Sequence, residues 1–365
     1  MDRFVCVRLV RAETLDLALF DFDPDLSFAV FFIDADQTIY GRYGSRSSFA
    51  EAERDVSLDS LQKAMESALE WHAKDAEAKG ALAGKRGATP EYRKLADFPR
   101  EAGARGPRRG RGPDEREGEE GGRRRRRDEE GRGGRCSHCH DLGNRRQLSY
   151  LARGEPIPDD VLFAWPMPAV VGLDLDPRER ATIRRVVDAS AAAKAGFREG
   201  DEIRELQGQP IFSIADRQWV LQNTSDAGRL EAKVERGGEP VSIALDLESG
   251  WRRKTDISWR TTTRVLRSRL LGGYQFREAT DEERSALEIP AGKLALKAAR
   301  GRRGSSSPLQ RGDVIVAVDG KTEPRTESDL IGYFASHPTQ KITLSVVRGE
   351  AKVELEVRVI EGVDL

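Results

Sequence analysis

Two stretches of this chain share the pattern that decides the fold: residues 198–208 read REGDEIRELQG, and residues 311–320 read RGDVIVAVDG. In both, a Gly-Asp pair precedes an apolar strand pattern, and a further glycine follows the strand. Glycine adopts turn conformations that side chains resist, and an aspartate bonds the amides of a turn. The pattern therefore predicts a tight turn, a strand and a second turn, twice in one chain.

The residues downstream of each core repeat as well. A helical stretch follows, SIADRQWVLQN at 213–223 and TESDLIGYFASH at 326–337. Each helix is followed by two strands joined by a glycine turn, at 229–247 and 340–359. Because order and spacing agree, we expect two copies of one domain and a multidomain α+β fold.

A helix of small residues, AAAKAGF at 191–197, precedes the first core and allows close packing on a sheet. The whole arrangement resembles PDZ domains of the bacterial type, as found behind periplasmic serine proteases. The resemblance covers about 170–247 and 276–359, and the second copy departs from it where SSSPLQ stands at 305–310. It implies two β-sandwich or barrel domains with two helices each, at 169–250 and 276–361.

The resemblance also implies a site for extended peptides or protein C-termini. PDZ domains add such a peptide as a strand to a sheet edge, and loop amides before that strand hold the terminal carboxylate. The implied site residues are Val171, Gly172, Leu173 and Leu175 in the first copy, and Gly292 and Leu294 in the second. The alternative is that both modules only space or pack.

Residues 136–140 read CSHCH and hold two of the three cysteines of the chain. C-x-x-C-H is the attachment motif of c-type haem, in which Cys136 and Cys139 bond the haem and His140 ligates the iron. Met167 is the candidate sixth ligand. A redox dithiol, a metal site and an accident of composition are the alternatives. Zinc is disfavoured because a structural zinc site takes four ligands, so no metal ligand is assigned.

Residues 1–75 show a strand pattern at 4–10, a hairpin pattern over 28–43 and a helix from Leu58 capped by Ser57. Cys6 lies in the first pattern and is expected to be buried. The hairpin and helix are similar to the later half of a thioredoxin-like fold that lacks its active-site segment. Together with the C-x-x-C-H motif and the two PDZ-like copies, they resemble a planctomycete-type family of thioredoxin-like/PDZ proteins, some members of which carry selenocysteine.

The remaining segments read as connectors. Residues 76–135 are rich in Arg, Gly and Glu and are predicted to be disordered. Residues 136–168 carry the C-x-x-C-H motif and a proline-rich connector, and 251–275 form a second linker. The net charge of −1 favours no nucleic-acid partner, and no apolar run approaches the roughly 18 residues of a membrane span. The chain shows no export signal and reads as cytoplasmic, unless a start upstream of Met1 directs it to the cell envelope.

Two functions follow as expectations. The first is a cell-envelope scaffold or adaptor that binds peptide or protein C-termini, with haem c for electron transfer. The alternative is a thiol or selenol redox enzyme of the thioredoxin class whose active-site segment lies upstream of Met1. No catalytic constellation is complete, and the four histidines lack the context of a serine protease domain, so enzymatic activity stays open. The sequence does not determine the oligomeric state.

Overall fold

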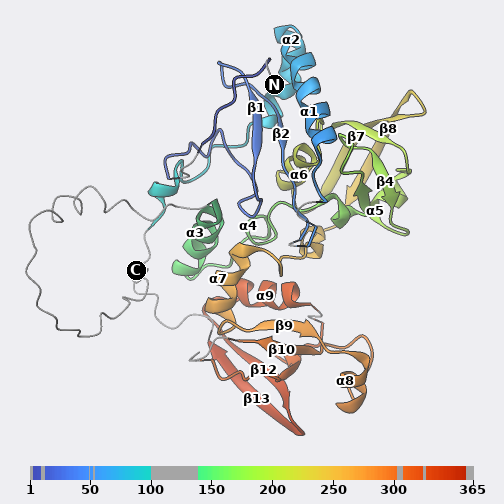
Figure 1. The fold of residues 1–365 in the computed structure, drawn as a ribbon. Helices are drawn as coiled ribbons and strands as arrows, with labels where there is room; N and C mark the ends of the chain where they lie inside the picture. The colour runs from blue at the N-terminus through green and yellow to red at the C-terminus, as the bar shows by residue number, and fades with distance from the viewer. Residues whose placement is uncertain are drawn as a thin grey trace, which may run out of the picture.

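The computed structural model describes residues 3–9, 13–48, 50–51, 54–99, 139–301, 307–323 and 326–358. Figure 1 shows an N-terminal unit (residues 3–99, blue) at the top, with a first domain (169–247, green to yellow) beside it. A second domain (275–358, orange to red) lies below both. Short helices from the intervening segments fill the space where the three parts meet.

The N-terminal unit is built on a hairpin. Strand β1 (Val30–Ile33) pairs antiparallel with β2 (Ile39–Tyr43), and the turn closes through a hydrogen bond from Asp34 N to Thr38 O at 3.3 Å. This confirms the predicted hairpin. The thioredoxin-like fold is not confirmed, because β1 and β2 form a two-stranded sheet that no third strand joins among the described residues.

Helix α1 (Leu58–His72) begins where the sequence predicts, after Ser57, whose side chain accepts a hydrogen bond from Ser60 N. The helix buries a row of small side chains, while Leu58 is 84% exposed. Small side chains allow the helix axis to approach its neighbours closely, which explains this choice of face. The buried residues are Ser60, Ala64, Ser67 and Ala68.

Three predictions for this unit are wrong. No strand forms in the described part of residues 4–10, and Cys6 is exposed. Residues 76–99 are ordered, although they were expected to begin a disordered segment. They form α2 (Ala76–Lys79) and the 3₁₀ helices η1 (Gly80–Lys85) and η2 (Leu95–Asp97). A few apolar side chains secure them, because neighbouring elements cover Leu82, Leu95 and Phe98. Residues 100–135 lie outside the described part.

The first domain encloses a core that includes Trp165, Trp219 and Trp251. One sheet has the order β6-β5-β7-β8, and β3 pairs with β4 in a separate sheet. Helix α5 packs on β8, as its small residues predict. The elements are β3 (Leu173–Leu175), β4 (Ile183–Val186), α5 (Ala191–Ala195), β5 (Glu202–Leu206), β6 (Gln209–Pro210), α6 (Ile214–Gln222), β7 (Gly228–Arg236) and β8 (Glu239–Leu247).

The second domain has one antiparallel sheet in the order β13-β12-β11-β10-β9. Helix α9 lies over this sheet in Figure 1, and its apolar side chains Leu330, Ile331 and Phe334 are fully buried. The elements are β9 (Gln275–Glu278), α8 (Asp281–Ala286), β10 (Leu296–Arg300), β11 (Val314–Val318), α9 (Glu327–Ser336), β12 (Lys341–Arg348) and β13 (Ala351–Arg358).

The Gly-Asp cores have the same geometry in both domains, as the repeat predicts. The buried carboxylate of Asp201 accepts a hydrogen bond from a turn amide at 2.9 Å and pairs with Arg236 at 2.7 Å. Asp313 accepts a turn amide at 2.7 Å and pairs with Arg348 at 2.7 Å. Each aspartate therefore ties its turn to the strand that follows the long helix.

The segments between the domains are helical and packed. They form α3 (Cys139–Ala152), α4 (Asp159–Leu162), η3 (Pro168–Val171), η4 (Trp251–Lys254) and α7 (Thr261–Leu270). The prediction of a linker at 251–275 is wrong, because Leu266 and Leu270 of α7 are buried in the same core as α9. No helix in the described part of the chain is long and apolar enough to cross a membrane.

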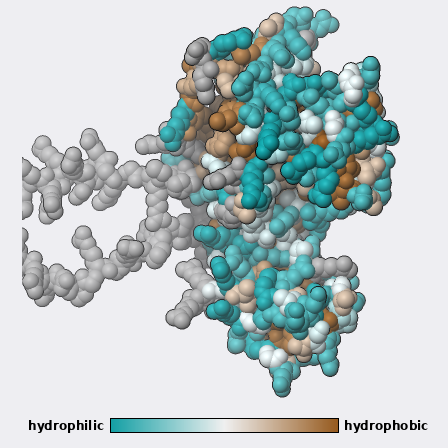
Figure 2. Space-filling view, turned by 45° about the vertical axis from the view of Figure 1, so that its right-hand side comes forward, coloured by the Kyte–Doolittle hydropathy of each residue, from teal (hydrophilic) through white to brown (hydrophobic). Residues whose placement is uncertain are grey.

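Most of the large apolar side chains that are exposed belong to the N-terminal unit, and brown atoms gather among teal ones in the upper part of Figure 2. In this unit they are Val5, Val7, Leu9, Phe28, Ile33 and Leu58. In the described part of the other two domains, Val187 is the large apolar side chain that is exposed.

Candidate functional site

The loop before β3 requires a glycine. Gly172 has φ +91°, and a Cβ at this position would lie 2.1 Å from Cβ of Ser190. Its carbonyl accepts a hydrogen bond from Val187 N at 2.9 Å, which starts the β3–β4 pairing. The close approach of α5 and the left-handed backbone therefore both exclude a side chain here.

Strand β3 presents a free edge on the side away from β4. Just beyond the strand ends, Gly172 O accepts a hydrogen bond from Val187 N and Asp176 N donates to Thr182 O. Because strand residues alternate, the intervening Leu173 and Leu175 point their N–H groups away from β4. We call the backbone of Leu173–Leu175 the first edge. The structure thus brings Val171, Gly172 and both leucines together at one strand end, as the resemblance implies.

The side chains of these residues form the base of the first edge. Val171, Leu173 and Leu175 are all buried in the core of the first domain. η3, which leads into β3, contacts α6, and Ile214 of α6 packs against the same core. A strand added at this edge would therefore lie over apolar side chains beside the start of α6.

The N-terminal unit fastens to the outer side of α6. Asp216 accepts a hydrogen bond from Arg42 N at 3.0 Å and pairs with Lys85 Nζ at 3.0 Å, and both charged side chains of this pair are 1% exposed. The Arg42 guanidinium lies 3.7 Å from the ring centre of Trp219. Burial lowers the pKa of Lys85 to about 8, with Asp216 acting in the opposite direction. A buried ion pair and a cation–π contact therefore join the N-terminal unit to α6.

The same unit reaches across to the far end of β3. Ser45 Oγ lies 3.5 Å from Gln218 Oε1 on α6, and Ser57 Oγ donates to Pro177 O at 3.0 Å, in the turn after β3. Lys63 Nζ pairs with Glu179 at 2.5 Å in that turn. The N-terminal unit thus braces the two sides that flank the first edge.

The corresponding edge of the second domain is identified by its hydrogen bonds. Ile183 N and Ala298 N each donate at 2.8 Å to the backbone carbonyl of the aspartate in the Gly-Asp core of their own domain. Opposite them, Leu175 pairs with Ile183 and Phe276 pairs with Ala298. Strand β9 is therefore the counterpart of β3, and we call its outward-facing backbone the second edge.

The predicted site residues of the second domain do not lie at the second edge. Gly292 and Leu294 lie between α8 and β10, and Leu294 N donates to Thr322 O at 3.2 Å. The loop before β9 is instead Gly272-Gly273, with φ values of +61° and +81°. Helix α8 lies between β9 and β10, so the loop that the sequence suggested as the start of the peptide-receiving strand precedes β10 and not β9.

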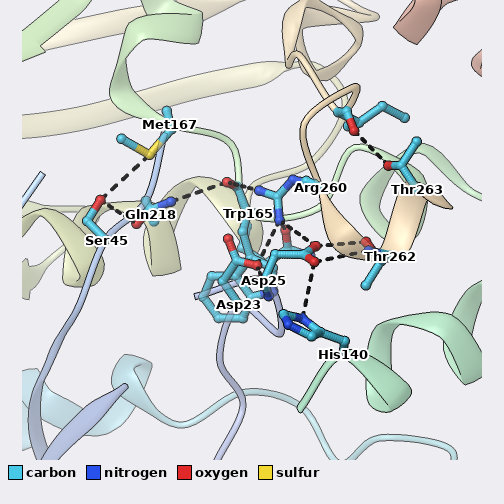
Figure 3. A network of polar contacts seen from close by, with 12 residues as sticks. Asp23, Asp25, Ser45, His140, Trp165, Met167, Gln218, Arg260, Thr262 and Thr263 are labelled. Atoms are coloured by element: carbon cyan, nitrogen blue, oxygen red, sulfur yellow. Dashed lines mark hydrogen bonds and ion pairs between the residues drawn. The ribbon is translucent and has the colours of Figure 1, made fainter. Parts of the chain in front are cut away.

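The described part of the C-x-x-C-H motif sits at the start of α3 (Figure 3). His140 Nδ1 lies 3.4 Å from a carboxylate oxygen of Asp25, and this contact raises the pKa of His140. Cys139 is exposed at the first position of α3, and partial burial raises the pKa of its thiol. Cys136 lies outside the described residues, so haem attachment stays a prediction.

Asp25 belongs to a network that joins three separate segments. Arg260 pairs with Asp23 at 2.7 Å and with Asp25 at 3.3 Å, and Thr262 Oγ1 donates to Asp25 at 2.7 Å (Figure 3). Burial alone would raise the pKa of Asp25, but His140 and the other partners lower it to about 2. The N-terminal unit is thereby tied to α3 and to the start of α7.

Met167 lies at the other end of this network, with its sulfur 3.8 Å from Ser45 Oγ (Figure 3). The structure therefore gives no support to Met167 as a sixth ligand opposite His140. The described residues contain no group of three or more His, Cys, Asp or Glu side chains arranged to hold a metal ion.

Sequence reasoning missed the buried charged residues that assemble these parts. Lys85 lies in a stretch of glycine and alanine, and Arg260 lies in a segment expected to be a linker. The Ser213–Asp216 spacing was a visible signal of a helix cap. It could not reveal that the carboxylate of Asp216 also binds residues 42 and 85.

Comparison with known proteins identifies the class of the first domain. Residues 169–247 match the family model described as PDZ domain, so this part of the chain is a PDZ domain. The first edge described above is the edge at which domains of this class take up extended peptides.

Individual relatives point to proteolysis. A probable periplasmic serine endoprotease DegP-like of Pseudomonas savastanoi pv. phaseolicola is 29% identical over 147 residues, which are 40% of this chain and 30% of the relative. The periplasmic pH-dependent serine endoprotease DegQ of Escherichia coli is 24% identical over 185 residues, or 51% of this chain and 38% of the relative. The chain thus spans about a third of the length of these curated relatives.

These relatives correct the expected function. The expectation of a cell-envelope scaffold with a haem for electron transfer, or of a thiol redox enzyme, is contradicted by relatives that are periplasmic serine endoproteases. Nothing in the comparisons supports the thioredoxin-like assignment. The interaction role of the PDZ domain and the periplasmic setting of the relatives stand.

Proposed function

We propose that this chain recognises extended polypeptide in a protease-related process, and that its PDZ domain is the part that binds. The observation that carries the proposal is the first edge, where Leu173 and Leu175 present N–H groups on the side of β3 away from β4. A peptide strand would satisfy both groups, and the apolar base would receive alternate side chains.

The relatives supply the second half of the proposal. Periplasmic serine endoproteases that share sequence with this chain place peptide recognition in the context of proteolysis. Because these relatives are periplasmic, we also propose that this chain works in the cell envelope. The second domain, with its equivalent Gly-Asp core and Asp313–Arg348 pair, is proposed to be a second PDZ domain.

Fluorescence anisotropy tests the binding step. A fluorescein-labelled decapeptide with an apolar free C-terminus is titrated with the full chain, beside the same peptide with N-methyl groups at alternate residues. Because an added strand bonds through its backbone, N-methylation should abolish binding while leaving every side chain in place. Equal affinity for both peptides, or none for either, would overturn recognition by strand addition.

The link to proteolysis needs its own measurement. Degradation of β-casein by Escherichia coli DegQ is followed with and without a tenfold excess of this chain over the protease. A chain that recognises the same unfolded segments should change the rate of cleavage. An unchanged rate, with peptide affinity intact, would separate this chain from protease substrates.

A further inference from the structure

The two long helices begin in the same way, which allows their first residues to be compared. Ser213 Oγ accepts a hydrogen bond from Asp216 N at the start of α6, and Thr326 Oγ1 accepts one from Asp329 N at the start of α9. Both hydroxyl residues are the N-caps of their helices. The first helical residue is therefore Ile214 in the first domain and, at the equivalent position, Glu327 in the second.

The side chain of Glu327 reaches from the start of α9 to the second edge. Its Oε1 accepts a hydrogen bond from Phe276 N at 3.2 Å. Phe276 is the counterpart of Leu175, so this amide is the one that an added peptide strand would need. Its hydrogen bond is already taken by a side chain of the same domain.

Arg267 of α7 secures the carboxylate in that position. Its Nε and Nη2 donate to the two oxygens of Glu327 at 2.5 and 2.9 Å, and Nη2 also donates to Ser258 O. The two side chains are 6% and 7% exposed. A peptide would have to separate a buried, bidentate ion pair before reaching Phe276, and each charge would then lie buried without its partner.

The first domain has no such ion pair at the equivalent position. Ile214 is apolar, packs against the core and carries no group that could accept a bond from Leu175 N. We propose that the first residue of the long helix decides which domain takes up peptide, so that Ile214 leaves the amide of Leu175 uncapped and Glu327, held by Arg267, caps that of Phe276. This inference rests on the proposed function, and it predicts one peptide per chain.

Hydrogen exchange in the full chain tests the closure without any peptide. The amide of Phe276 should be protected in the wild type. It should exchange at least tenfold faster in the double variant Glu327→Ile with Arg267→Met, which replaces the ion pair by apolar side chains of similar size. The same slow exchange of Phe276 in both proteins would overturn the closure, whatever the peptide results are.

Peptide stoichiometry tests the consequence. Calorimetry with the decapeptide should give one site in the wild type and two in the double variant. The reverse change, Ile214→Glu, should weaken the first site about tenfold or more, since the carboxylate can cap Leu175 N. Two sites in the wild type, or one in the double variant with Phe276 freed, would refute the role of this position. Absence of any binding alongside a protected Phe276 would instead count against the proposed function alone.

Discussion

Replacing Asp216 by alanine tests how the N-terminal unit is joined to the PDZ domain. Its carboxylate accepts hydrogen bonds from Arg42 N and Phe212 N, both at 3.0 Å, and pairs with Lys85 Nζ at 3.0 Å. The Lys85–Asp216 pair is buried almost completely. The substitution therefore leaves a buried lysine without its counter-charge and two backbone N–H groups without an acceptor.

The loss in the free energy of unfolding depends on the buried groups that lose their partner. Removing one partner of a buried ion pair costs about 3–5 kcal/mol, and the orphaned N–H groups put Asp216→Ala at the upper end of that range. Lys85→Met should cost less, because Asp216 keeps both of its backbone bonds. The double variant should cost less than the sum of the two, with a coupling of about 1–3 kcal/mol.

Urea unfolding followed by tryptophan fluorescence measures these free energies. Trp219 is a suitable reporter, because its Nε1 donates to Gly84 O at 2.9 Å and Arg42 lies over its ring. A free energy of unfolding for Asp216→Ala within about 1 kcal/mol of the wild type would refute the reasoning. Strict additivity in the double variant would refute it as well.

The pH dependence of the same comparison carries a definite sign. The pKa of Lys85 is lowered from 10.5 to about 8 in the folded chain. Between these values the unfolded chain holds more protons, so the free energy of unfolding rises with pH. The wild type should therefore gain stability relative to Lys85→Met as the pH rises from 8 to 10.5. A difference that stays constant or shrinks over this range would contradict the lowered pKa.

Three further predictions concern other parts of the chain. Gly172→Ala should destabilise the PDZ domain by about 1–3 kcal/mol through backbone strain, measured by thermal unfolding. Adding Ser190→Gly to this variant should recover part of the loss, because it removes the 2.1 Å contact. Asp25→Asn should lower the pKa of His140, which an NMR titration measures. The stability that this pair adds is complete below pH 6.5 and is lost as the pH rises through the raised pKa of His140. An unchanged pKa of His140 in the variant would contradict the contact. Phe98→Ala should cost about 3–5 kcal/mol in chemical unfolding, whereas a disordered segment would show no change.

The repeat was predictable because its signal is local. The turns around Asp201 and Asp313 need a glycine and a short acceptor next to each other, and these residues are adjacent in the sequence. The same holds for the hairpin over 28–43 and for the start of α1 at Ser57. In each case the interaction that defines the element lies within a few residues of the pattern that predicts it.

The second edge and the junctions could not be predicted in the same way. The strand that corresponds to β3 is β9, and the pair Gly272-Gly273 stands before it. Because α8 separates β9 from β10, the sequence pattern suggested the loop before β10 instead. The partners of Asp216 in the N-terminal unit, Arg42 and Lys85, lie more than 100 residues away along the chain. Nothing in the neighbourhood of Lys85 distinguishes it from a solvated lysine, because only the assembled fold buries it.

The function was misjudged for a related reason. The C-x-x-C-H motif and the hairpin directed the expectation towards redox chemistry, whereas the sequence shared with other proteins points to periplasmic endoproteases. Short motifs carry little information on their own. The match to the PDZ domain family extends over residues 169–247 and draws on a whole domain.

The pairing of Asp23 with Arg260 has a consequence for how the chain is made. These residues are 237 positions apart, and the contact between Arg42 and Asp216 spans 174 positions. During synthesis the N-terminal unit emerges before the residues of α6 and α7 to which it binds. It therefore cannot reach its final place until the segment that follows the PDZ domain has been made.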